Sequence, residues 1–563
     1  MTEFLKFQKS NCKNCYKCIR NCPVKSIRFS GNQANVIADE CILCGRCYVV
    51  CPQNAKKVAD ETEIVGVLLK EDAPVIASIA PSFAAYYEGC GISALQKALK
   101  KLGFFDAEET AIGATMVKRE YEKLALSGER DIIITSCCHT INLLVEKYYP
   151  QLAGTLAPVV TPMQAHCADI KRRYPNAKTV FIGPCLSKKD EAALSSVDAA
   201  LTFDELTFML EKAEIELERG DDRDGKGLAR LFPTTGGILK TLLKKNSAYT
   251  YLSIDGIENC KSVLNDIAAG SIHHCFIEMS SCIGSCIGGP IMEKYRNSPL
   301  RHYQAITKYA GTEDFDVEQP ESCLLSEEHA CIEVKKLCPS EAEINEILKK
   351  MGKLSPDDEL NCGTCGYDTC RDKAIAVYQG KAEINMCLPY LMEKSERFSN
   401  NILDNTPNGI MVVNEACEIQ QINPAAMRML NINTRSDVLG GPVIRVMDPS
   451  VFIDTLNKGK HVVNKRDYYA EFDRYLELTI VPDKKSGNLI SIFRDVTDEE
   501  NERRSKEALS QQTVETADRV VDKQMRIVQE IASLLGETAA ETKIALTKLK
   551  ESISYAVFCL KKK

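Results

Sequence analysis

Three things are scarce in this sequence: histidine, long apolar runs and an excess of positive charge. The 563 residues include only 7 histidines, which argues against a histidine-rich metal site. No apolar run is long enough to cross a bilayer, and none stands at the N-terminus, so neither a membrane span nor a secretory leader is predicted. The net charge of -7 gives no basic footprint for nucleic acid. We therefore expect a cytoplasmic protein without a membrane or nucleic-acid partner.

Cysteine, in contrast, is abundant, with 26 residues. A disulfide scaffold would be short and secreted, whereas here many cysteines stand in tight metal-ligand spacings within a chain long enough for several domains. A hydrophobic content of 44% is sufficient for ordinary globular cores. These features favour a cysteine-ligated iron–sulfur protein from a reducing, anaerobic cytoplasm.

Residues 1–60 contain one cysteine pattern twice, C-x2-C-x2-C-x3-C-P. In this arrangement the fourth cysteine of each run ligates the other cluster. Zinc is the alternative, but zinc sites use pairs of CxxC without a repeated third and fourth cysteine. The segment resembles a bacterial two-cluster ferredoxin, which implies an electron wire. The two predicted [4Fe-4S] ligand sets are Cys12, Cys15, Cys18 and Cys51, and Cys41, Cys44, Cys47 and Cys22.

Residues 72–340 form a second predicted unit, in which short apolar strands at 75–80, 132–134 and 180–182 alternate with helical stretches. This alternation favours an α/β fold. Three stretches in it carry cysteine: Thr135-Ser-Cys-Cys138, Pro184-Cys-Leu-Ser-Lys-Lys189, and Glu278-Met-Ser-Ser-Cys-Ile-Gly-Ser-Cys286. The first two follow predicted buried strands, where an α/β sheet usually places its ligands. In the third, glycines let the backbone pass close to a metal centre.

These three stretches, in this order, resemble the signature motifs of the iron-only ([FeFe]) hydrogenases. In that family four cysteines hold a [4Fe-4S] cluster, and one of them bridges to a two-iron subcluster that carries CO, cyanide and a bridging dithiolate amine. The resemblance implies that Cys286 is the bridging thiolate, that the Cys137 thiol passes protons, and that Lys188 binds a cyanide ligand. The implied cluster ligands, followed by the segment implied to cover the other cyanide, are Cys138, Cys185, Cys282 and Cys286, and Ala80, Pro81 and Ser82.

The sequence also departs from the family pattern around the two-iron site. Gly183 stands where a methionine precedes Pro184, and Ser280 stands where a methionine lies two positions before the third cysteine. Since these positions line the site, we expect a more open and more polar pocket there.

The proton route of the family looks interrupted. Val117 stands at the position of the first relay glutamate, and Ala157 at that of the relay serine, while Glu120 matches the second glutamate. A valine cannot carry a proton. His139, which with Thr140 replaces the usual Pro-Gly, is a candidate for a substitute route, although a lone histidine is more often structural. Fast turnover by the usual route is therefore not expected.

Residues 341–394 hold four more cysteines, at Cys362, Cys365, Cys370 and Cys387. Their spacing, with two glycines in the tight part, predicts a third accessory [4Fe-4S] cluster, and the segment resembles a small iron–sulfur module of corrinoid and electron-transfer proteins. Zinc is again the alternative, but the spacing lacks paired knuckles. Outside all of these motifs we expect Cys90, Cys167, Cys260 and Cys275 to be buried structural thiols, and we leave Cys323, Cys331 and Cys338 unassigned.

Cysteine nearly vanishes in residues 395–497. Predicted strands at 410–413, 419–422, 468–472, 475–480 and 489–493, with a capped helix start at Asn423-Pro424, indicate an antiparallel sheet with short helices. The order of NGIMVV, INPAA and the closing Asp495-Val-Thr497 resembles a PAS sensor domain. No residue identifies a ligand, and Cys417 is expected to lie in a turn.

Residues 498–563 are charged and helical. Val521, Met525, Val528, Ala532 and Leu535 have coiled-coil spacing up to Gly536, and a second helix is predicted with Leu546, Leu549 and Ile553 on one face. The alternative is an amphipathic helix that packs on its own domain. Because no kinase or DNA-binding motif is present, any output is expected through these helices, to a signalling protein or to a second copy of the chain.

Taken together, the predicted fold is multidomain α/β: a ferredoxin-like domain, an α/β hydrogenase domain, a small iron–sulfur module, an α+β PAS domain and C-terminal helices. The architecture resembles the sensory subgroup of the hydrogenases, which implies slow, reversible oxidation of H2 to protons and electrons with a ferredoxin-like electron carrier. Two alternatives stay open. One is a fast ferredoxin-linked hydrogenase with an appended PAS domain, and the other is a non-catalytic iron–sulfur redox sensor or scaffold.

Overall fold

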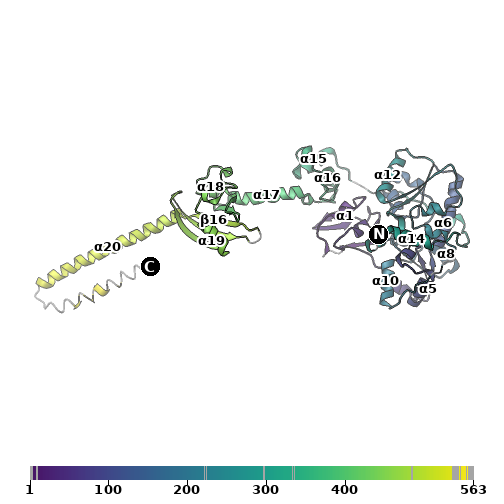
Figure 1. Cartoon of the computed structure of the whole chain (residues 1–563), viewed down its shortest axis with the longest axis horizontal. Coiled ribbons are helices and arrows are strands. Elements are labelled where there is room, and N and C mark those ends of the chain that lie inside the picture. Colours follow the sequence, from purple (N-terminus) through teal and green to yellow (C-terminus); the bar gives the residue numbers. More distant parts are fainter. Residues whose placement is uncertain are drawn as a thin grey trace. The chain divides into compact units, whose positions relative to one another are not determined.

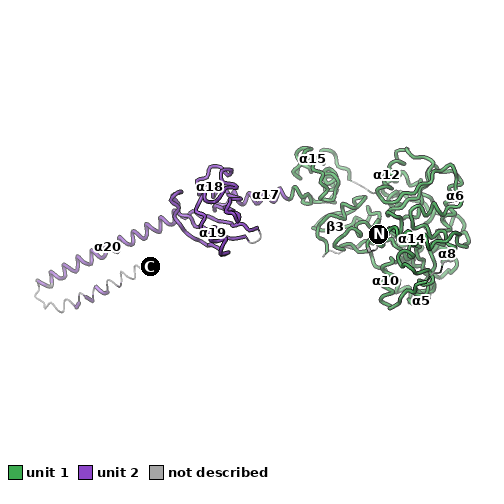
Figure 2. Tube along the Cα trace, viewed as in Figure 1, with its two compact units in different colours: residues 1–391 green, residues 392–563 purple. Residues whose placement is uncertain are grey.

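The computed structural model of the chain separates into two compact units, residues 1–391 and residues 392–563 (Figure 2). It describes residues 4–7, 11–220, 222, 225–295, 298–332, 334, 337–483 and 486–534, and, within 541–555, residues 544, 545, 547, 548, 550–552 and 555. Each unit is described by itself below, and Figure 1 labels its elements.

The N-terminal part of the first unit repeats one small motif. Two antiparallel pairs, β1 (Leu5–Phe7) with β4 (Lys56–Val58) and β2 (Ile27–Ser30) with β3 (Gln33–Val36), accompany two one-turn helices, α1 (Lys17–Arg20) and α2 (Arg46–Val49). Each helix starts after a residue with positive φ, Tyr16 (55°) and Gly45 (72°). These turns place the cysteines of the two runs at equivalent positions.

Two parallel sheets form the body of the first unit. One has the order β6-β5-β8-β9 and the other β10-β11-β7. Their strands are short and largely buried, as parallel strands covered on both faces should be. The chain passes from the first sheet to the second after β6, returns after β7, and crosses again after β9. The strands are β5 (Val75–Ile79), β6 (Asp106–Glu109), β7 (Ile132–Ile134), β8 (Lys178–Gly183), β9 (Ala199–Thr202), β10 (Thr250–Asp255) and β11 (Cys275–Ser280).

Helices flank these sheets, and two of them begin at reciprocal caps. The Thr161 side chain caps α8 with Gln164 as partner, and Thr202 caps α10 with Glu205, so both starts are fixed by sequence. The helices are α3 (Thr62–Leu68), α4 (Phe83–Tyr86), α5 (Ile92–Leu102), α6 (Ala111–Ser127), α7 (His139–Tyr148), α8 (Pro162–Arg173), α9 (Ser187–Ala193), α10 (Phe203–Lys212), α11 (Gly237–Thr241), α12 (Ile257–Ala268), α13 (Pro290–Tyr295) and α14 (Pro299–Tyr309).

The small module consists of α15 (Glu341–Lys350) and α16 (Cys370–Tyr378), which pack through Ile344, Leu348 and Ala374. It docks on the N-terminal motif. Arg20 donates to the Thr364 carbonyl (3.1 Å), the Phe29 amide donates to the Lys381 carbonyl (2.7 Å), and the Lys381 ammonium pairs with the Glu40 carboxylate (2.5 Å). The module is therefore part of the first unit and is fixed by backbone as well as charged contacts.

The second unit has one antiparallel sheet of order β13-β12-β16-β15-β14. The strand expected at 468–472 is wrong, because residues 470–473 form the turn between β14 and β15 and the strand lies before it. Asp473, at positive φ (53°), closes that turn. The elements are α17 (Leu388–Asn405), β12 (Gly409–Val413), β13 (Ile419–Ile422), α18 (Pro424–Met429), α19 (Ser450–Lys458), β14 (Val462–Tyr469), β15 (Arg474–Pro482), β16 (Leu489–Asp495) and α20 (Thr497–Leu534).

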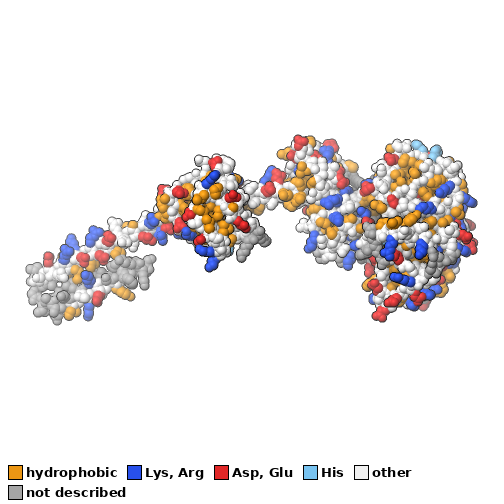
Figure 3. All heavy atoms as spheres, viewed as in Figure 1, with side chains coloured by type: hydrophobic (Ala, Val, Ile, Leu, Met, Phe, Trp, Pro, Cys, Tyr) orange, Lys and Arg blue, Asp and Glu red, His pale blue; other side chains and the backbone are white. Residues whose placement is uncertain are grey.

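The long helix α20 carries the expected coiled-coil seam as far as the structure describes it. Val521 and Met525 are half-buried and Val528 is exposed. The Ala532 side chain and Leu535, Gly536, Leu546, Leu549 and Ile553 lie outside the described residues. On the visible face of both units, acidic and basic side chains are interspersed (Figure 3). Among the described helices, none combines the length and apolarity that a bilayer crossing requires.

Asn423 organises the start of the second unit, and its loss should destabilise that unit. Its buried side chain accepts from the amides of Ile410 (2.7 Å) and Ala426 (2.9 Å) and donates to the carbonyls of Leu403 and Asn408 (2.9 Å each). We expect Asn423→Ala to lower the free energy of opening by about 2–4 kcal/mol, since a helix cap and several buried hydrogen bonds are lost.

Native-state hydrogen exchange of β12 and β16 in the full chain measures this change. Asn401→Ala on the exposed face of α17 is the control, with an expected change within about 0.5 kcal/mol. Equal effects of the two substitutions would contradict the role of Asn423.

Candidate metal centre

The sequence motifs meet at the carboxyl ends of four parallel strands from both sheets. Residues 80–82 follow β5, Cys138 comes soon after β7, Cys185 follows β8 and Cys282 follows β11. Strand pairing fixes these ends in register: Ile79 pairs with Ile182, and Ile134 with Ile277. Residues far apart in sequence are thus brought to one place by backbone hydrogen bonding, which is the usual location of a site in an α/β fold.

The four sulfurs of Cys138, Cys185, Cys282 and Cys286 lie close enough to influence one another. Burial raises the pKa of the Cys282 thiol well above its usual value, and the neighbouring Cys185 and Cys138 raise it further. Burial also raises the pKa of Cys286 to about 12, again with Cys138 and Cys185 adding to the shift. The Ser281 hydroxyl lies 3.7 Å from both Cys138 Sγ and Cys282 Sγ. Such a set of thiols favours a positively charged metal group among them.

The geometry fits a cluster better than a single ion. Among the described residues, no three histidine, cysteine or acidic side chains lie close enough together to hold one metal ion. The described cysteines are also all free thiols. A cubane holds its four thiolates around a larger core than one ion does, so this donor set suits an iron–sulfur cluster.

The loop with the last two cysteines depends on glycine. Gly284 has φ +81°, a conformation that other residues rarely adopt, and it precedes the short 3-10 turn Ser285–Gly288. A Cβ on Gly288 would lie 1.9 Å from the Ile283 carbonyl oxygen. The backbone therefore folds tightly on itself between Cys282 and Cys286, and only glycine fits at position 288.

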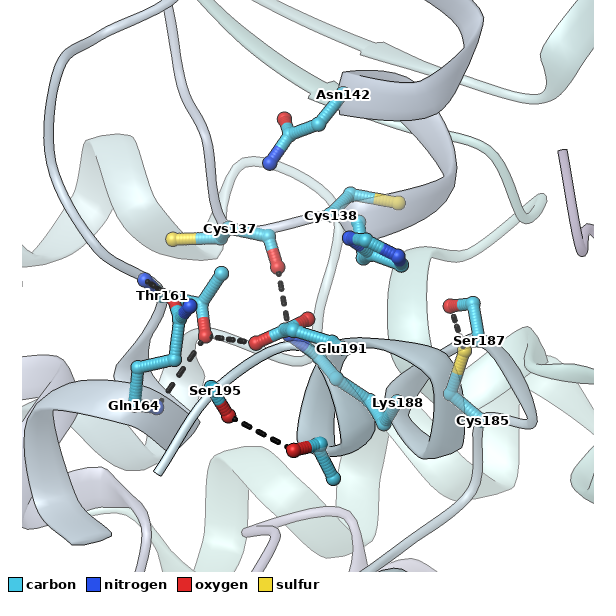
Figure 4. A network of polar contacts seen from close by, with 12 residues as sticks. Cys137, Cys138, Asn142, Thr161, Gln164, Cys185, Ser187, Lys188, Glu191 and Ser195 are labelled. Carbon is cyan, nitrogen blue, oxygen red and sulfur yellow. Dashed lines mark hydrogen bonds and ion pairs between the residues drawn. The ribbon is translucent and has the colours of Figure 1, made fainter. Parts of the chain in front are cut away.

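Lys188 is held at the site by a carboxylate (Figure 4). Its ammonium contacts Glu191 Oε2 at 2.5 Å and donates to the Cys137 carbonyl at 3.2 Å. The Thr161 hydroxyl donates to the other oxygen of Glu191. Although burial lowers the pKa of Lys188, Glu191 raises it more, so the net shift is upward. Lys188 is thus a buried cation fixed beside the sulfurs.

Cys137 has a partner that the sequence does not indicate. Its sulfur lies 3.2 Å from the Tyr121 hydroxyl, which also accepts from the Ser136 amide at 3.0 Å. Burial raises the pKa of the Cys137 thiol to about 12. Tyr121 lies on α6 and is fully buried, so Cys137 faces a hydrogen-bonding group of the protein interior.

The residues of the expected proton relay are not brought to Cys137 by any hydrogen bond of the described residues. Val117 is buried on α6, and Ala157 is also buried. Glu120 binds Lys123 (2.7 Å) and Gln319 (2.9 Å) instead. The His139 ring contacts the Asp190 carboxylate at 3.0 Å, which gives it a partner on α9.

The segment after β5 contains a buried hydroxyl without a partner. Among the described residues, Ser82 Oγ finds no hydrogen-bond acceptor or donor, although the side chain is fully buried. Such orphaned groups are costly and rare. Ala80 and Pro81 are buried beside it. An acceptor bound at this place would satisfy the Ser82 hydroxyl, which fits the anionic ligands of the implied group.

The expectation of a more open pocket is wrong at position 183. A Cβ on Gly183 would lie 2.7 Å from the ring of Phe181 and 3.2 Å from the Ala80 Cβ. The Phe181 ring therefore occupies the space that a side chain at 183 would take. Pro184 is buried next to it, and Ser280 is half-buried at the end of β11.

The N-terminal motif lies against this centre through its second cysteine run. Lys147, on α7, donates to the Cys41 carbonyl at 2.8 Å, and Arg46 forms a two-pronged pair with Glu293 at 2.9 and 3.0 Å. A cleft of about 480 Å³ is lined by Cys22 and Cys44 of the motif and by Cys282. The second ligand set thus adjoins the centre.

The first ligand set adjoins the small module. The Tyr16 pKa is raised by burial and then by Glu383, Cys12 and Cys365, so its ring lies between the first run and the module. Of the module cysteines, Cys387 is buried, Cys365 and Cys370 are half-buried, and Cys362 is exposed.

The cysteines outside the motifs divide by burial. Cys167, Cys260 and Cys275 are buried, as expected of structural thiols. Cys90 is half-buried and lines a surface cleft, so the expectation of burial is wrong for it. The unassigned Cys323, Cys331 and Cys338 are exposed.

Sequence reasoning gave no role to Tyr121 or Glu191. Glu191 stands three positions after Lys188, so the helical spacing of opposite charges was a usable signal. Tyr121 had no such signal, because only the packing of α6 on β7 brings it to Cys137.

Gly288→Ala should disrupt the cysteine loop. The added methyl group collides with the Ile283 carbonyl, and relief of the overlap must shift Cys282 or Cys286, at a cost of about 1–3 kcal/mol. We expect fewer iron atoms per chain after anaerobic reconstitution. Gly154→Ala, where a Cβ has no neighbour within 4 Å, is the control. Full iron content in both variants would show that the loop is not tight.

Glu278 should make stability depend on pH. Burial raises its pKa from 4.5 to about 7, opposed by the Leu239 amide at 3.0 Å. Because the folded state prefers the protonated carboxyl, its contribution is present below about pH 4.5 and is lost as pH rises to 7, by roughly 3 kcal/mol. Hydrogen exchange of β11 in the native chain, relative to Glu278→Gln, should show this slope. A difference that stays constant with pH would contradict it.

Comparison with known proteins assigns these parts. Residues 73–290 match the family model "Iron only hydrogenase large subunit, C-terminal domain", and residues 4–52 match a 4Fe-4S dicluster domain. Residues 358–389 match an Fe-S cluster model, and residues 396–463 match a PAS domain.

Two curated relatives are hydrogenases. Iron hydrogenase 1 of Clostridium pasteurianum is 26% identical over 282 residues, which are 38% of this chain and 49% of the relative. The periplasmic [Fe] hydrogenase large subunit of Nitratidesulfovibrio vulgaris is 27% identical over 266 residues, 35% of this chain and 62% of the relative. The chain thus spans less than two thirds of the length of either relative.

Among solved structures, a variant [FeFe]-hydrogenase from Chlamydomonas reinhardtii is similar, with 17% identity and a TM-score of 0.39, over 49% of this chain and 100% of that chain. The PAS domain of nitrogen regulation protein NR(II) from Vibrio parahaemolyticus has 15% identity and a TM-score of 0.15, over 17% of this chain and 96% of that chain. On the family matches and the two relatives, the chain is a member of the iron-only hydrogenase family that also contains a 4Fe-4S dicluster domain and a PAS domain.

Proposed function

We propose that this chain is a slow, regulatory hydrogenase, which oxidises H2 reversibly to protons and electrons and reports that reaction through its PAS domain. The observation that carries the proposal is the convergence of four sulfurs, a fixed buried lysine and an orphaned buried serine at the ends of four strands. The family match to the iron-only hydrogenases supports it. The electron acceptor is proposed to be a ferredoxin-like carrier.

The residues present fit the cofactor of the family. Cys138, Cys185, Cys282 and Cys286 would hold the [4Fe-4S] part, with Cys286 as the bridge to a two-iron subsite. When bound, this subsite, with its CO, cyanide and dithiolate ligands, supplies the hydrogen chemistry.

The surrounding side chains have positioning roles in this proposal. Lys188, held by Glu191, offers an ammonium to an anionic ligand, and Ser82 offers a hydroxyl with no other partner among the described residues. Cys137 is the proton carrier nearest the site, and Tyr121 orients its sulfur. Ala80, Pro81, Gly183, Pro184 and Ser280 complete the wall.

The missing relay is the reason for a low rate. Glu120 binds Lys123 and Gln319, and Val117 has no group that carries a proton. Protons that leave Cys137 therefore meet Tyr121 and Ser136 in a buried, neutral environment rather than a chain of carboxylates. A site that binds hydrogen but moves protons slowly suits a sensor better than a bulk producer.

Electrons have a continuous set of candidate carriers. The ligand set of Cys41, Cys44, Cys47 and Cys22 adjoins the centre, the set of Cys12, Cys15, Cys18 and Cys51 follows, and the set of Cys362, Cys365, Cys370 and Cys387 lies beside the latter. We propose a [4Fe-4S] cluster in each. A signalling protein or a second copy of the chain would read the state through the helices after the PAS domain.

The test is hydrogen turnover and infrared spectra of the anaerobically matured chain. We expect infrared bands of metal-bound CO and cyanide, together with a rate at least about 100-fold below that of a bulk hydrogen producer, since general acid–base relays contribute 10²–10⁴-fold. A rate equal to that of a bulk producer, unchanged when residues after 395 are removed, would favour the fast ferredoxin-linked hydrogenase. Absence of the infrared bands after maturation would establish the non-catalytic redox scaffold.

A further inference from the structure

Lys373 is a lysine in an unusual place. It lies on α16 in the small module, and its side chain is fully buried. Lysine is almost never fully buried unless it is paired. Its ammonium donates one hydrogen bond, to the Glu383 carbonyl oxygen at 2.6 Å. A carbonyl dipole alone is weak compensation for a buried positive charge.

The nearby acidic groups are turned away from Lys373. The Glu383 carboxylate accepts from the Gly31 amide at 3.2 Å, and the Asp372 carboxylate caps its own helix at Thr369. Within the part of the chain that the structure describes, no carboxylate lies at ion-pair distance from the Lys373 ammonium. The burial of this cation therefore needs another source of negative charge.

The cysteines of the module are that source. Burial lowers the pKa of Lys373, and Cys365, Cys387 and Cys370 are the groups that oppose the shift most. Lys373 thus faces three of the four sulfurs that we assign to one cluster. As thiolates around a cluster, these sulfurs supply the missing negative charge.

The other lysines of the module are placed differently. Lys381 is also buried, but it pairs with the Glu40 carboxylate at 2.5 Å. Lys353 influences Cys370 and Cys362, yet it is only half-buried, so water screens its charge. Lys373 is the lysine that is both close to the sulfurs and shielded from water.

We propose that Lys373 is the built-in counter-charge of the cluster held by Cys362, Cys365, Cys370 and Cys387, and that it raises the reduction potential of that cluster. The physical reason is that the cluster gains one negative charge on reduction, and a buried cation at short range stabilises that charge more than it stabilises the oxidised form. The inference rests on the proposed function only in that these four cysteines must hold an iron–sulfur cluster.

The position of this cluster gives the tuning a use. Cys387 immediately precedes α17, and its carbonyl accepts from the Leu391 amide at 2.9 Å in the first helical turn. A raised potential keeps an electron at the base of the helix that leads into the PAS domain. Hydrogen oxidation would then be recorded as charge next to that helix.

The experiment is a redox titration of the full holoprotein with dithionite as the electron donor, followed by EPR. The module signal is assigned by its loss in the double variant Cys362→Ala, Cys370→Ala. We expect Lys373→Met, which removes the charge at similar length, to lower the equilibrium constant for one-electron reduction of this cluster at least tenfold, which is 59 mV. Lys353→Met is the matched control, with an expected change below threefold.

Equal small shifts in Lys373→Met and Lys353→Met would overturn the proposal, since the buried position would then have no special effect. If Lys373→Met does not retain iron, Lys373→Gln, which keeps a donor for the Glu383 carbonyl, replaces it with the same expectation. In the unsubstituted protein labelled with ¹⁵N-lysine, electron–nuclear double resonance should detect a nitrogen coupled to the reduced module cluster. Absence of that coupling also contradicts the proposal, whereas absence of any module signal in the unsubstituted protein contradicts the cluster assignment itself.

Discussion

The pairing of β5 with β8 and of β7 with β11 is the constraint on which the rest depends. These strands come from two sheets, and between them the chain crosses from one sheet to the other. Only because their carboxyl ends meet do cysteines from positions 138, 185 and 282 share one place. The tight glycine loop after β11 then adds Cys286 to the set. The metal centre is thus a product of sheet topology, and every functional side chain around it is carried by a strand end or by the helix that follows.

One electrostatic theme recurs beside each assigned ligand set: a lysine whose ammonium donates to a backbone carbonyl close to cysteine. Lys147 donates to the Cys41 carbonyl at 2.8 Å, Lys188 to the Cys137 carbonyl at 3.2 Å, and Lys56 to the Ala34 carbonyl at 2.5 Å. Lys188 differs because Glu191 neutralises it. Iron–sulfur potentials respond to local charge and burial. The protein therefore has a separate means of adjusting each centre, and Lys373 is the least compensated example.

Much of this arrangement was predictable from the sequence, because cysteine spacing and strand periodicity are local signals. The duplicated run, the strands at 132–134 and 180–182 and the cap at Asn423 all needed only neighbouring residues. What failed or was missed depends on packing across the fold. The Phe181 ring fills the space beside Gly183, Tyr121 reaches Cys137 from another helix, and Asp473 shortens a hairpin that alternation alone extended. Lys373 gives no sequence signal either, since nothing local marks a lysine for complete burial.

The docking of the small module on the N-terminal motif has a consequence for biosynthesis. Arg20 and Thr364 stand 344 positions apart, yet they are hydrogen-bonded. Closing so long a loop costs conformational entropy, and the partner segment leaves the ribosome only after the whole α/β domain. The face of the motif around Arg20 and Phe29 must therefore stay uncovered for most of translation. The nascent chain is then open to delivery of iron and sulfide at the N-terminal cysteines, and arrival of residues 363–383 closes that access, which sets an order of assembly along the polypeptide.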